Sequence, residues 1–230
     1  MLVPTEAEDV EGSLALADRR MYAAKGAGRR SASRQTRDVL MKALAEHGAE
    51  LHRHVEEVAA LAVRVAKDLG LSNEEVDEVS RAAELHDIGK VAIPDAILSK
   101  PGPLDAQEWA FMKRHTIIGE RILGAAPALA PVARLVRSTH ERFDGAGYPD
   151  GLAAEAIPLG ARVVFVCDAF NAMTTERPYS KALPPKVALA ELRRCAGTQF
   201  DPRVVEAFCA VVTGAGEELT ASLPSGALLE

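Results

Sequence analysis

Apolar residues recur every three or four positions along almost the whole chain, and this spacing limits the possible folds more than any other feature. The pattern is clearest in residues 50–69, where it places one apolar face on a predicted helix that Gly70 closes. Alanine, leucine, glutamate and arginine dominate, and only 4% of the 230 residues are aromatic. Such a composition favours helices over strands. The sequence therefore predicts an all-α protein.

Turn and cap residues divide the rest of the chain into further helices. Ser72 with Glu75, and Asp105 with Glu108, have the form of capping boxes, which open helices. Four turn formers within eight residues make 144–151 a loop. The predicted helices cover residues 50–69, 72–86, 105–115, 127–140, 161–174, 185–196 and the stretch that begins with Asp201 and Pro202.

Composition excludes several classes of protein. The 48% of hydrophobic residues argue against disorder, and no apolar run approaches the roughly 18 residues of a membrane helix. The net charge of −6 argues against a binder of duplex DNA. Three widely spaced cysteines indicate neither a disulfide framework nor a CxxC zinc site. We therefore expect a cytoplasmic protein without a membrane span.

A short boundary separates two parts of the chain. Residues 26–34 are small, basic and without apolar periodicity, which is typical of a linker. We predict an N-terminal helix and linker in 1–30, a main domain in 35–215 and a C-terminal tail in 216–230. The helix within 36–69 is the predicted interface of a homodimer.

Six histidine and aspartate side chains fall on or at the ends of the predicted helices: His54, His86, Asp87, His115, His140 and Asp168. Imidazole nitrogen combined with carboxylate oxygen suits manganese, iron, zinc or nickel better than magnesium or calcium alone. One carboxylate can bridge two metals, and a pair of cations promotes in-line phosphoryl displacement. The set therefore predicts a metal site suited to hydrolysis of a phosphoester.

Single members of this set have simpler interpretations. Taken alone, His54 or His115 is better explained as a core histidine bonded to a backbone carbonyl, and Asp168 as a capping or ion-paired acid. Gly89 is expected to break the preceding helix, so that the adjacent His86 and Asp87 can face one metal. The metal interpretation rests on the whole set rather than on any one residue.

The segments 86–90 (HDIGK) and 140–149 (HERFDGAGYP) resemble the signatures of the HD-GYP family of metal-dependent phosphohydrolases. Further matches follow in order at 94–104, 112–115, 157–162 and 177–179, so that the resemblance covers 35–212. It implies an all-α HD-domain bundle with a metal site in its core and a GYP loop. It also implies hydrolysis of cyclic di-GMP to linear pGpG or GMP by hydroxide that bound metals activate. Residues 16–29 resemble the closing helix of a GGDEF domain, which implies GGDEF-domain or receiver-type signalling partners.

The resemblance also implies roles for single residues. Asp87 would bridge two divalent transition ions, iron or manganese, and Lys90 would face the bridging water or the phosphate. Asp87 and Lys90 are therefore the implied catalytic residues. Glu50, four residues before His54, would be a ligand of a third metal, with a solvated surface glutamate as the alternative. The implied ligands of the first metal are His54, His86, Asp87 and Asp168, and those of the second are Asp87, His115 and His140.

Three positions depart from the family pattern. Thr139 stands where the family usually has a histidine, and this removes a ligand of the second metal. Asn171 stands where an aspartate is frequent, so it keeps a coordinating carbonyl, as a weak ligand, but loses a charge. Ser180 stands in place of a basic residue, with Lys181 one position later. These departures would weaken the second site, shift its metal preference or lower turnover.

Substrate binding is expected at the 144–151 loop. Gly145 and Gly147 allow backbone angles and close approach that a side chain would prevent, and Tyr148 offers a ring for base stacking. Arg177 and Lys181 suit the oxygens of a phosphate. The alternatives are a structural turn in which Tyr148 covers the core, and an ion pair of Arg177 with its neighbour.

Three functions remain open at this point. The first is a cyclic di-GMP phosphodiesterase. The second, which Thr139 keeps open, is a weakly active or inactive relative that acts as a metal- or nucleotide-binding signalling or interaction module. The third is a hydrolase of another cyclic dinucleotide or of a nucleoside phosphate.

Overall fold

A computed structural model of the chain describes residue 40, residues 49–176 and residues 181–221, with side chains described from Val55 to Glu176 and from Lys181 to Gly214. These residues form helices and, within the described ranges, no strand, which confirms the all-α prediction. The elements are α2 (Ala49–Asp68), α3 (Asn73–Leu85), η1 (Ile88–Ala92), α4 (Asp95–Leu98), α5 (Ala106–Met112), α6 (His115–Gly124), η2 (Pro127–Leu129), α7 (Ala130–Arg137), η3 (Ala154–Ala156), α8 (Leu159–Thr174), α9 (Pro185–Arg194) and α10 (Pro202–Ala221).

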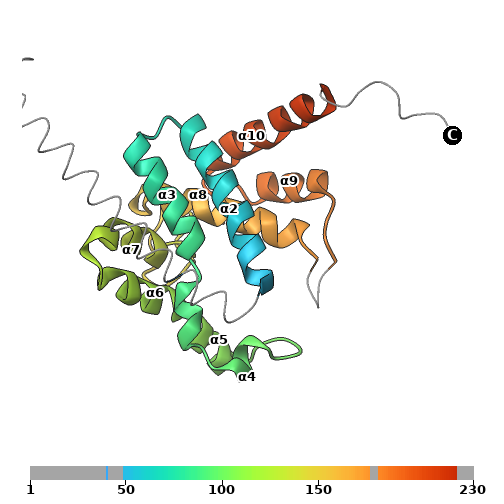
Figure 1. Cartoon of the computed structure of the whole chain (residues 1–230). Coiled ribbons are helices and arrows are strands. Elements are labelled where there is room, and N and C mark those ends of the chain that lie inside the picture. The colour runs from blue at the N-terminus through green and yellow to red at the C-terminus, as the bar shows by residue number, and fades with distance from the viewer. Residues whose placement is uncertain (1–39, 41–48, 177–180, 222–230) are drawn as a thin grey trace, which may run out of the picture.

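Helices α2, α3 and α8 pack against one another at the centre of the bundle (Figure 1). Their facing side chains are buried, among them Val58, Leu85 and Val163. Helices α6 and α7 pack as a pair on one side of this core, and α9 and α10 complete the other (Figure 1). The short α4 and α5 lie at the end of the bundle away from α10 (Figure 1), and η1, which precedes them in the chain, packs against α6.

Local signals set the ends of several helices as predicted. Gly70 has a φ of +78°, and its N–H donates to Lys67 while the N–H of Leu71 donates to Ala66, which is the hydrogen-bond pattern of a Schellman cap on α2. Ser72 opens α3 through a complete capping box with Glu75. Hydrogen bonds between residues close in sequence therefore define these boundaries.

Two predicted helices end earlier than the pattern indicates. The helix opened by the capping box of Asp105 ends at Met112, and His115 begins the separate helix α6. The predicted helix 127–140 consists of the 3₁₀ turn η2 followed by α7, which ends at Arg137 and leaves His140 in a turn. Both corrections move a histidine out of the interior of a helix, because His115 is the first residue of α6 and His140 lies in the turn after α7.

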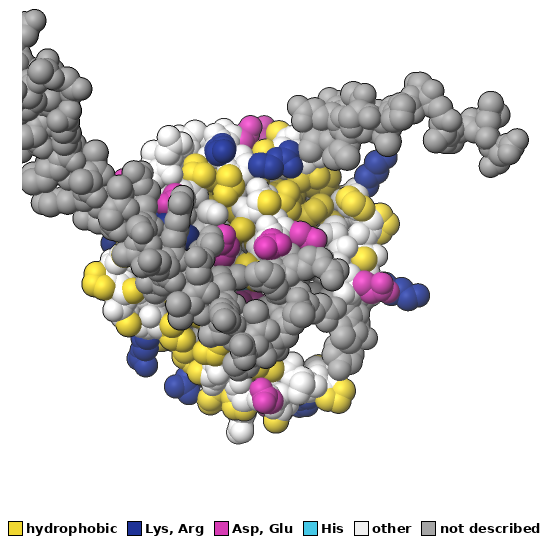
Figure 2. All heavy atoms as spheres, in the orientation of Figure 1, with side chains coloured by type: hydrophobic (Ala, Val, Ile, Leu, Met, Phe, Trp, Pro, Cys, Tyr) yellow, Lys and Arg dark blue, Asp and Glu magenta, His cyan; other side chains and the backbone are white. Residues whose placement is uncertain are grey.

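Several predictions lie outside the described residues. The segment 1–30, with its resemblance to a GGDEF helix, is one of them, and the predicted homodimer interface in 36–69 stays a prediction. The backbone of α10 runs on to Ala221, past the predicted boundary at residue 215. Among the described residues, no helix combines the length and apolar character that a membrane crossing requires. On the face drawn in Figure 2, the described lysine and arginine side chains are spread out rather than gathered into one patch.

Candidate metal centre

Asp87 occupies the centre of the site because three chain segments meet around it. His86 caps the C-terminus of α3, and Asp87 precedes η1 directly. The two carboxylate oxygens of Asp87 face different imidazoles: Oδ2 lies 3.5 Å from Nε2 of His86, and Oδ1 lies 3.7 Å from Nε2 of His115. Lys90 donates to Oδ2 at 2.7 Å. The carboxylate is buried, so the neighbours of its oxygens are protein groups rather than bulk solvent.

The two imidazoles are held in the same tautomer. Nδ1 of His86 lies 2.8 Å from the carbonyl of Ala83, and Nδ1 of His115 lies 2.8 Å from the carbonyl of Met112. Because a carbonyl only accepts, each Nδ1 carries a proton, and Nε2 of a neutral ring in this tautomer presents a lone pair. Metal-binding histidines usually donate their other N–H in this way.

The residues fit a metal ion. Nε2 of His115 is buried and has no hydrogen-bond partner among the described residues, and its lone pair faces the oxygen of a carboxylate. Two such acceptors repel each other unless a cation lies between them. Their separation of 3.7 Å is too long for a hydrogen bond, whereas two ligand bonds of about 2 Å each would span it.

His140 and Asp168 complete the part of the site that the structure describes. His140 lies in the turn after α7, and one ligand atom from each of Asp87, His115 and His140 lies within 4.8 Å of the others. Asp168, from the middle of α8, places Oδ1 3.7 Å from Nε2 of His86. Residues from four segments thus converge on the two sides of the Asp87 carboxylate.

Charge and burial keep these groups in the forms that bind metal. Burial alone would raise the pKa of Asp87, but Lys90, His86 and His115 outweigh it and hold that pKa well below its usual value. Burial lowers the pKa of His115 despite the neighbouring Asp87. Desolvation, reinforced by His115, lowers the pKa of His140 to about 3. The carboxylate is therefore ionised at neutral pH, and both of these imidazoles are neutral.

Gly89 has a role different from the predicted one. The chain after Asp87 continues as the 3₁₀ turn η1, so Gly89 does not act as a helix-ending residue in a left-handed conformation. A Cβ atom on Gly89 would lie 1.9 Å from the carbonyl oxygen of His115 and 2.7 Å from the backbone nitrogen of Gly119. Only glycine allows η1 to lie this close to α6, and this approach brings Asp87 to His115.

Other predicted site residues have varied outcomes. The side chains of Glu50 and His54 and the whole of Arg177 lie outside the described residues. Asn171 donates to Glu57 at 2.7 Å and its Oδ1 accepts from Thr175 at 3.1 Å, so the amide links α8 to α2. Lys181 is exposed on the segment between α8 and α9.

Thr139 is buried beside His140. Its hydroxyl donates to the carbonyl of Val136 at 2.9 Å, within the preceding turn of α7. The hydroxyl proton is therefore directed to the backbone. The resemblance implies an imidazole at this position, and the threonine hydroxyl instead bonds to a residue of α7.

The loop after His140 has the glycine geometry that the sequence predicts. Gly145 has a φ of +80°, and a Cβ atom on Gly147 would lie 2.2 Å from the backbone nitrogen of Arg142. The ring of Tyr148 stacks on His140, with centroids 5.2 Å apart and planes at 19°. The loop therefore holds Tyr148 directly against a residue of the metal centre.

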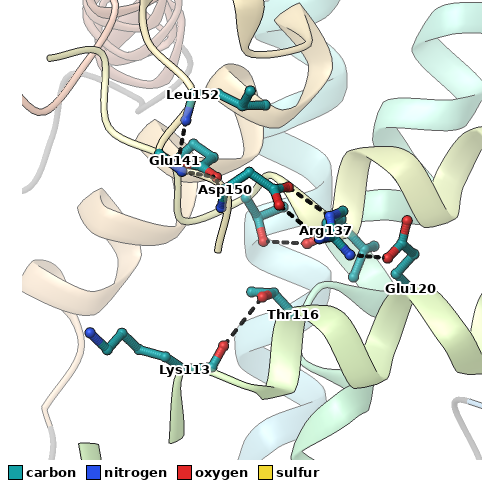
Figure 3. A network of polar contacts seen from close by, with 10 residues as sticks. Lys113, Thr116, Glu120, Arg137, Glu141, Asp150 and Leu152 are labelled. Carbon is teal, nitrogen blue, oxygen red and sulfur yellow. Dashed lines mark hydrogen bonds and ion pairs between the residues drawn. The ribbon is translucent and has the colours of Figure 1, made fainter. Parts of the chain in front are cut away.

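Two supports of this loop were missed by the sequence analysis. Glu141 is buried, and its carboxylate accepts from the backbone N–H groups of Asp150, Gly151 and Leu152 (Figure 3). Arg137, from the end of α7, pairs with Glu120 of α6 and makes a bidentate ion pair with Asp150, both at 2.7 Å (Figure 3). The position of Glu141 next to His140 within the motif was the available signal.

The start of the loop is also tied to a distant turn. The N–H of Phe143 donates to the carbonyl of Gln199, and the N–H of Asp144 donates to the carbonyl of Thr198. These residues belong to the connection between α9 and α10. The loop is therefore fixed at one end by Glu141 and Arg137 and at the other by this connection.

We expect Glu141→Gln to lower the free energy of unfolding by about 2 kcal/mol. The amide has the same shape, but it loses the charge that strengthens three backbone hydrogen bonds and presents an N–H₂ group to donors. Urea unfolding followed by circular dichroism measures the change. Glu155→Gln, at an exposed position of η3, is the matched control, and equal stability of the two variants would contradict the assignment of Glu141 as the anchor.

The fold and the site define a member of the HD domain family, because an all-helical bundle carries adjacent His86 and Asp87 at its centre. The family model for the HD domain matches residues 38–204, and the chain belongs to this family. It is similar to a cyclic di-GMP phosphodiesterase of Thermotoga maritima, with 46% identity over 69% of this chain and 44% of the relative. It is also similar to the cyclic di-GMP phosphodiesterase response regulator RpfG of Xanthomonas campestris pv. campestris, with 46% identity over 76% of this chain and 47% of the relative.

A solved structure supports the fold. The HDG"Y"P protein Bd1817 of Bdellovibrio bacteriovorus aligns with a TM-score of 0.58 and 20% identity, over 71% of this chain and 53% of that one. The chain spans less than half the length of the two curated relatives.

Proposed function

We propose that this chain is a metal-dependent phosphodiesterase that hydrolyses cyclic di-GMP to linear pGpG or to GMP. The observation that carries the proposal is the carboxylate of Asp87, whose two oxygens face separate imidazoles, His86 on one side and His115 on the other. This arrangement supports two cations that share one carboxylate, which suits in-line attack on a phosphodiester. The names of the similar relatives support the choice of a cyclic dinucleotide as substrate.

The side chains divide into three roles. His86, Asp168 and Asp87 would hold one divalent cation together with His54, and Asp87 with His115 and His140 would hold the second. When bound, such cations neutralise phosphate charge and lower the pKa of water. Lys90 donates to the side of Asp87 that faces His86, and its positive charge is placed to stabilise charge developing on the phosphate. Tyr148 lies over His140 and would contact the substrate.

The donor set narrows the choice of metal. It combines imidazole nitrogen with carboxylate oxygen, and Cys167, the thiol nearest in sequence, is buried in the core with its pKa raised by burial. A nitrogen and oxygen set without thiolate suits manganese, iron, zinc or nickel, and the resemblance to the HD-GYP family favours iron or manganese among them. The three free thiols support a reducing, cytoplasmic location for the activity. GGDEF-domain or receiver-type partners and a homodimer remain proposals from the sequence.

The test is hydrolysis of cyclic di-GMP by the chain after anaerobic loading with iron or manganese, with products separated by chromatography. We expect linear dinucleotide or GMP, and no product after removal of metal with EDTA. Cyclic GMP-AMP in a parallel reaction tests the alternative substrate. Absence of any product from loaded protein would contradict the proposal.

Thr139 favours a second candidate function, that of a metal- and nucleotide-binding module with little turnover. Its hydroxyl bonds Val136 rather than supplying an imidazole to the site. Elemental analysis distinguishes the candidates, because the module is expected to retain less than one metal equivalent per chain and to bind cyclic di-GMP without cleaving it.

A further inference from the structure

The helix α5 carries a large aromatic side chain at the edge of the metal centre. Trp109 is 46% exposed, and it is the only aromatic residue among the large hydrophobic side chains that are exposed in the described part of the chain. An exposed indole beside a polar site is typical of a binding surface.

Trp109 belongs to a group of rings that ends at the metal centre. Its indole stands nearly perpendicular to the ring of Tyr148, with centroids 6.4 Å apart and planes at 77°. Tyr148 in turn stacks on His140. A ligand whose phosphate reaches the metal centre would therefore have aromatic surface within reach on the side of α5.

A cation accompanies these two rings. Lys113 follows Trp109 by four residues, which places both on one face of α5 and its C-cap. The Nζ atom of Lys113 lies 5.8 Å from the centroid of the Tyr148 ring. Two rings with one cation combine the features that bind a nucleotide, because the rings stack on a base and the cation attracts a phosphate.

The local structure of α5 holds Trp109 in place. Asp105 caps the helix by accepting from the N–H groups of Gln107 and Glu108, and the Glu108 side chain completes the capping box. Lys100 pairs with Glu108 and ties the preceding segment to the same turn. A seven-residue helix is thus fixed at the turn that immediately precedes Trp109, and this lowers the entropy cost of presenting the ring.

We infer that Trp109, with Lys113 beside it, is a specificity-determining residue that stacks on a purine base of the substrate. The inference rests on the proposed function for the class of ligand, a purine-containing cyclic dinucleotide. It adds that the base is recognised from α5 as well as from the loop that carries Tyr148. A protein surface that covers Trp109 is the alternative occupant.

The chain contains a single tryptophan, so its intrinsic fluorescence reports on this residue alone when excitation favours indole over tyrosine. We expect cyclic di-GMP to quench the emission in a saturable way, recorded by stopped flow before turnover. Ribose 5-phosphate, which has a phosphate but no base, is expected to leave the emission unchanged. Absence of quenching by cyclic di-GMP, or an emission that changes with protein concentration instead, would overturn the inference.

Substitutions separate base recognition from folding and from chemistry. We expect Trp109→Ala to weaken cyclic di-GMP binding about tenfold, and Trp109→Phe to stay within about threefold of wild type. Val187→Ala, at a 49% exposed position of α9, is the control and should bind as wild type does. Calorimetry gives the dissociation constants without any need for turnover.

A substrate without a purine completes the test. For a ribose phosphodiester without bases, kcat/KM of Trp109→Ala should stay within about twofold of wild type, because this diester has no aromatic ring to stack on the indole. An unchanged KM of Trp109→Ala for cyclic di-GMP, with hydrolysis intact, would overturn the inference and leave the proposed function standing. If wild type hydrolyses nothing, the proposed function fails, and quenching by cyclic di-GMP still decides the role of Trp109.

Discussion

The Asp87→Asn variant is expected to bind manganese at least about 100-fold more weakly than wild type and to lose hydrolysis, while its helices stay folded. Asparagine keeps the shape of the side chain but removes the negative charge that both sides of the site share. It also places an amide N–H₂ group against the lone pair of His86 or of His115. Lys90 is about one-third exposed, so its charge reaches solvent after the ion pair is lost.

Isothermal calorimetry with Mn²⁺ measures the affinity, and circular dichroism reports on the fold. Asp95→Asn is the matched control, because Asp95 is exposed in α4 and lies only eight positions further along the chain. The control should bind manganese as wild type does. Wild-type affinity in Asp87→Asn would show that the carboxylate is not shared by the bound ions, and the two-cation arrangement would have to be abandoned.

Gly89→Ala is expected to lower the free energy of unfolding by about 3 kcal/mol, near the upper end for overpacking. The added methyl group would lie 1.9 Å from the carbonyl oxygen of His115 and 2.7 Å from the backbone nitrogen of Gly119. Both atoms belong to the backbone of α6, so the methyl group is accommodated only if η1 moves away. That movement separates Asp87 from His115, and manganese binding should fall together with stability.

Gly124→Ala provides the control for this variant. Gly124 is the last residue of α6, and a Cβ atom there would meet no atom of the described residues within 4 Å. Its stability should stay within about 1 kcal/mol of wild type. Urea unfolding of both variants, with manganese titration of the folded proteins, makes the comparison. A Gly89→Ala protein with wild-type stability would contradict the close approach of η1 and α6.

Much of the fold follows from local chemistry that the sequence displays. The Schellman cap at Gly70 and the capping boxes at Ser72 and Asp105 depend on contacts within a few residues, so they are predictable without knowledge of the fold. The separation of α5 from α6 is different. Lys113 and Arg114 favour helix by propensity, yet α5 ends before them and α6 begins after them. The carbonyl of Met112 accepts from Nδ1 of His115.

The residues of the site likewise divide into those that the sequence predicted and those that it did not. His86, Asp87, His115, His140 and Asp168 were named from their residue types and from a family resemblance, and the structure brings them together. The role of Glu141 was missed because a glutamate after a histidine has no periodic signature, and only the folded loop directs three backbone N–H groups to it. The role of Gly89 was predicted wrongly because the constraint on it comes from α6, which is remote in sequence.

The ties of Phe143 and Asp144 to the connection between α9 and α10 bear on how this chemistry can be transferred between proteins. The turn at Thr198 and Gln199 supplies two backbone carbonyls and one long side-chain contact, from Arg142 to the amide oxygen of Gln199 at 3.4 Å. Its influence on the site therefore depends mainly on the path of the backbone and only weakly on residue identity. Grafting the histidines, the aspartates and the glycine-rich segment onto another bundle would thus leave out one of the two attachments of the loop. An engineer would need to transfer α9, α10 and the connection between them as well.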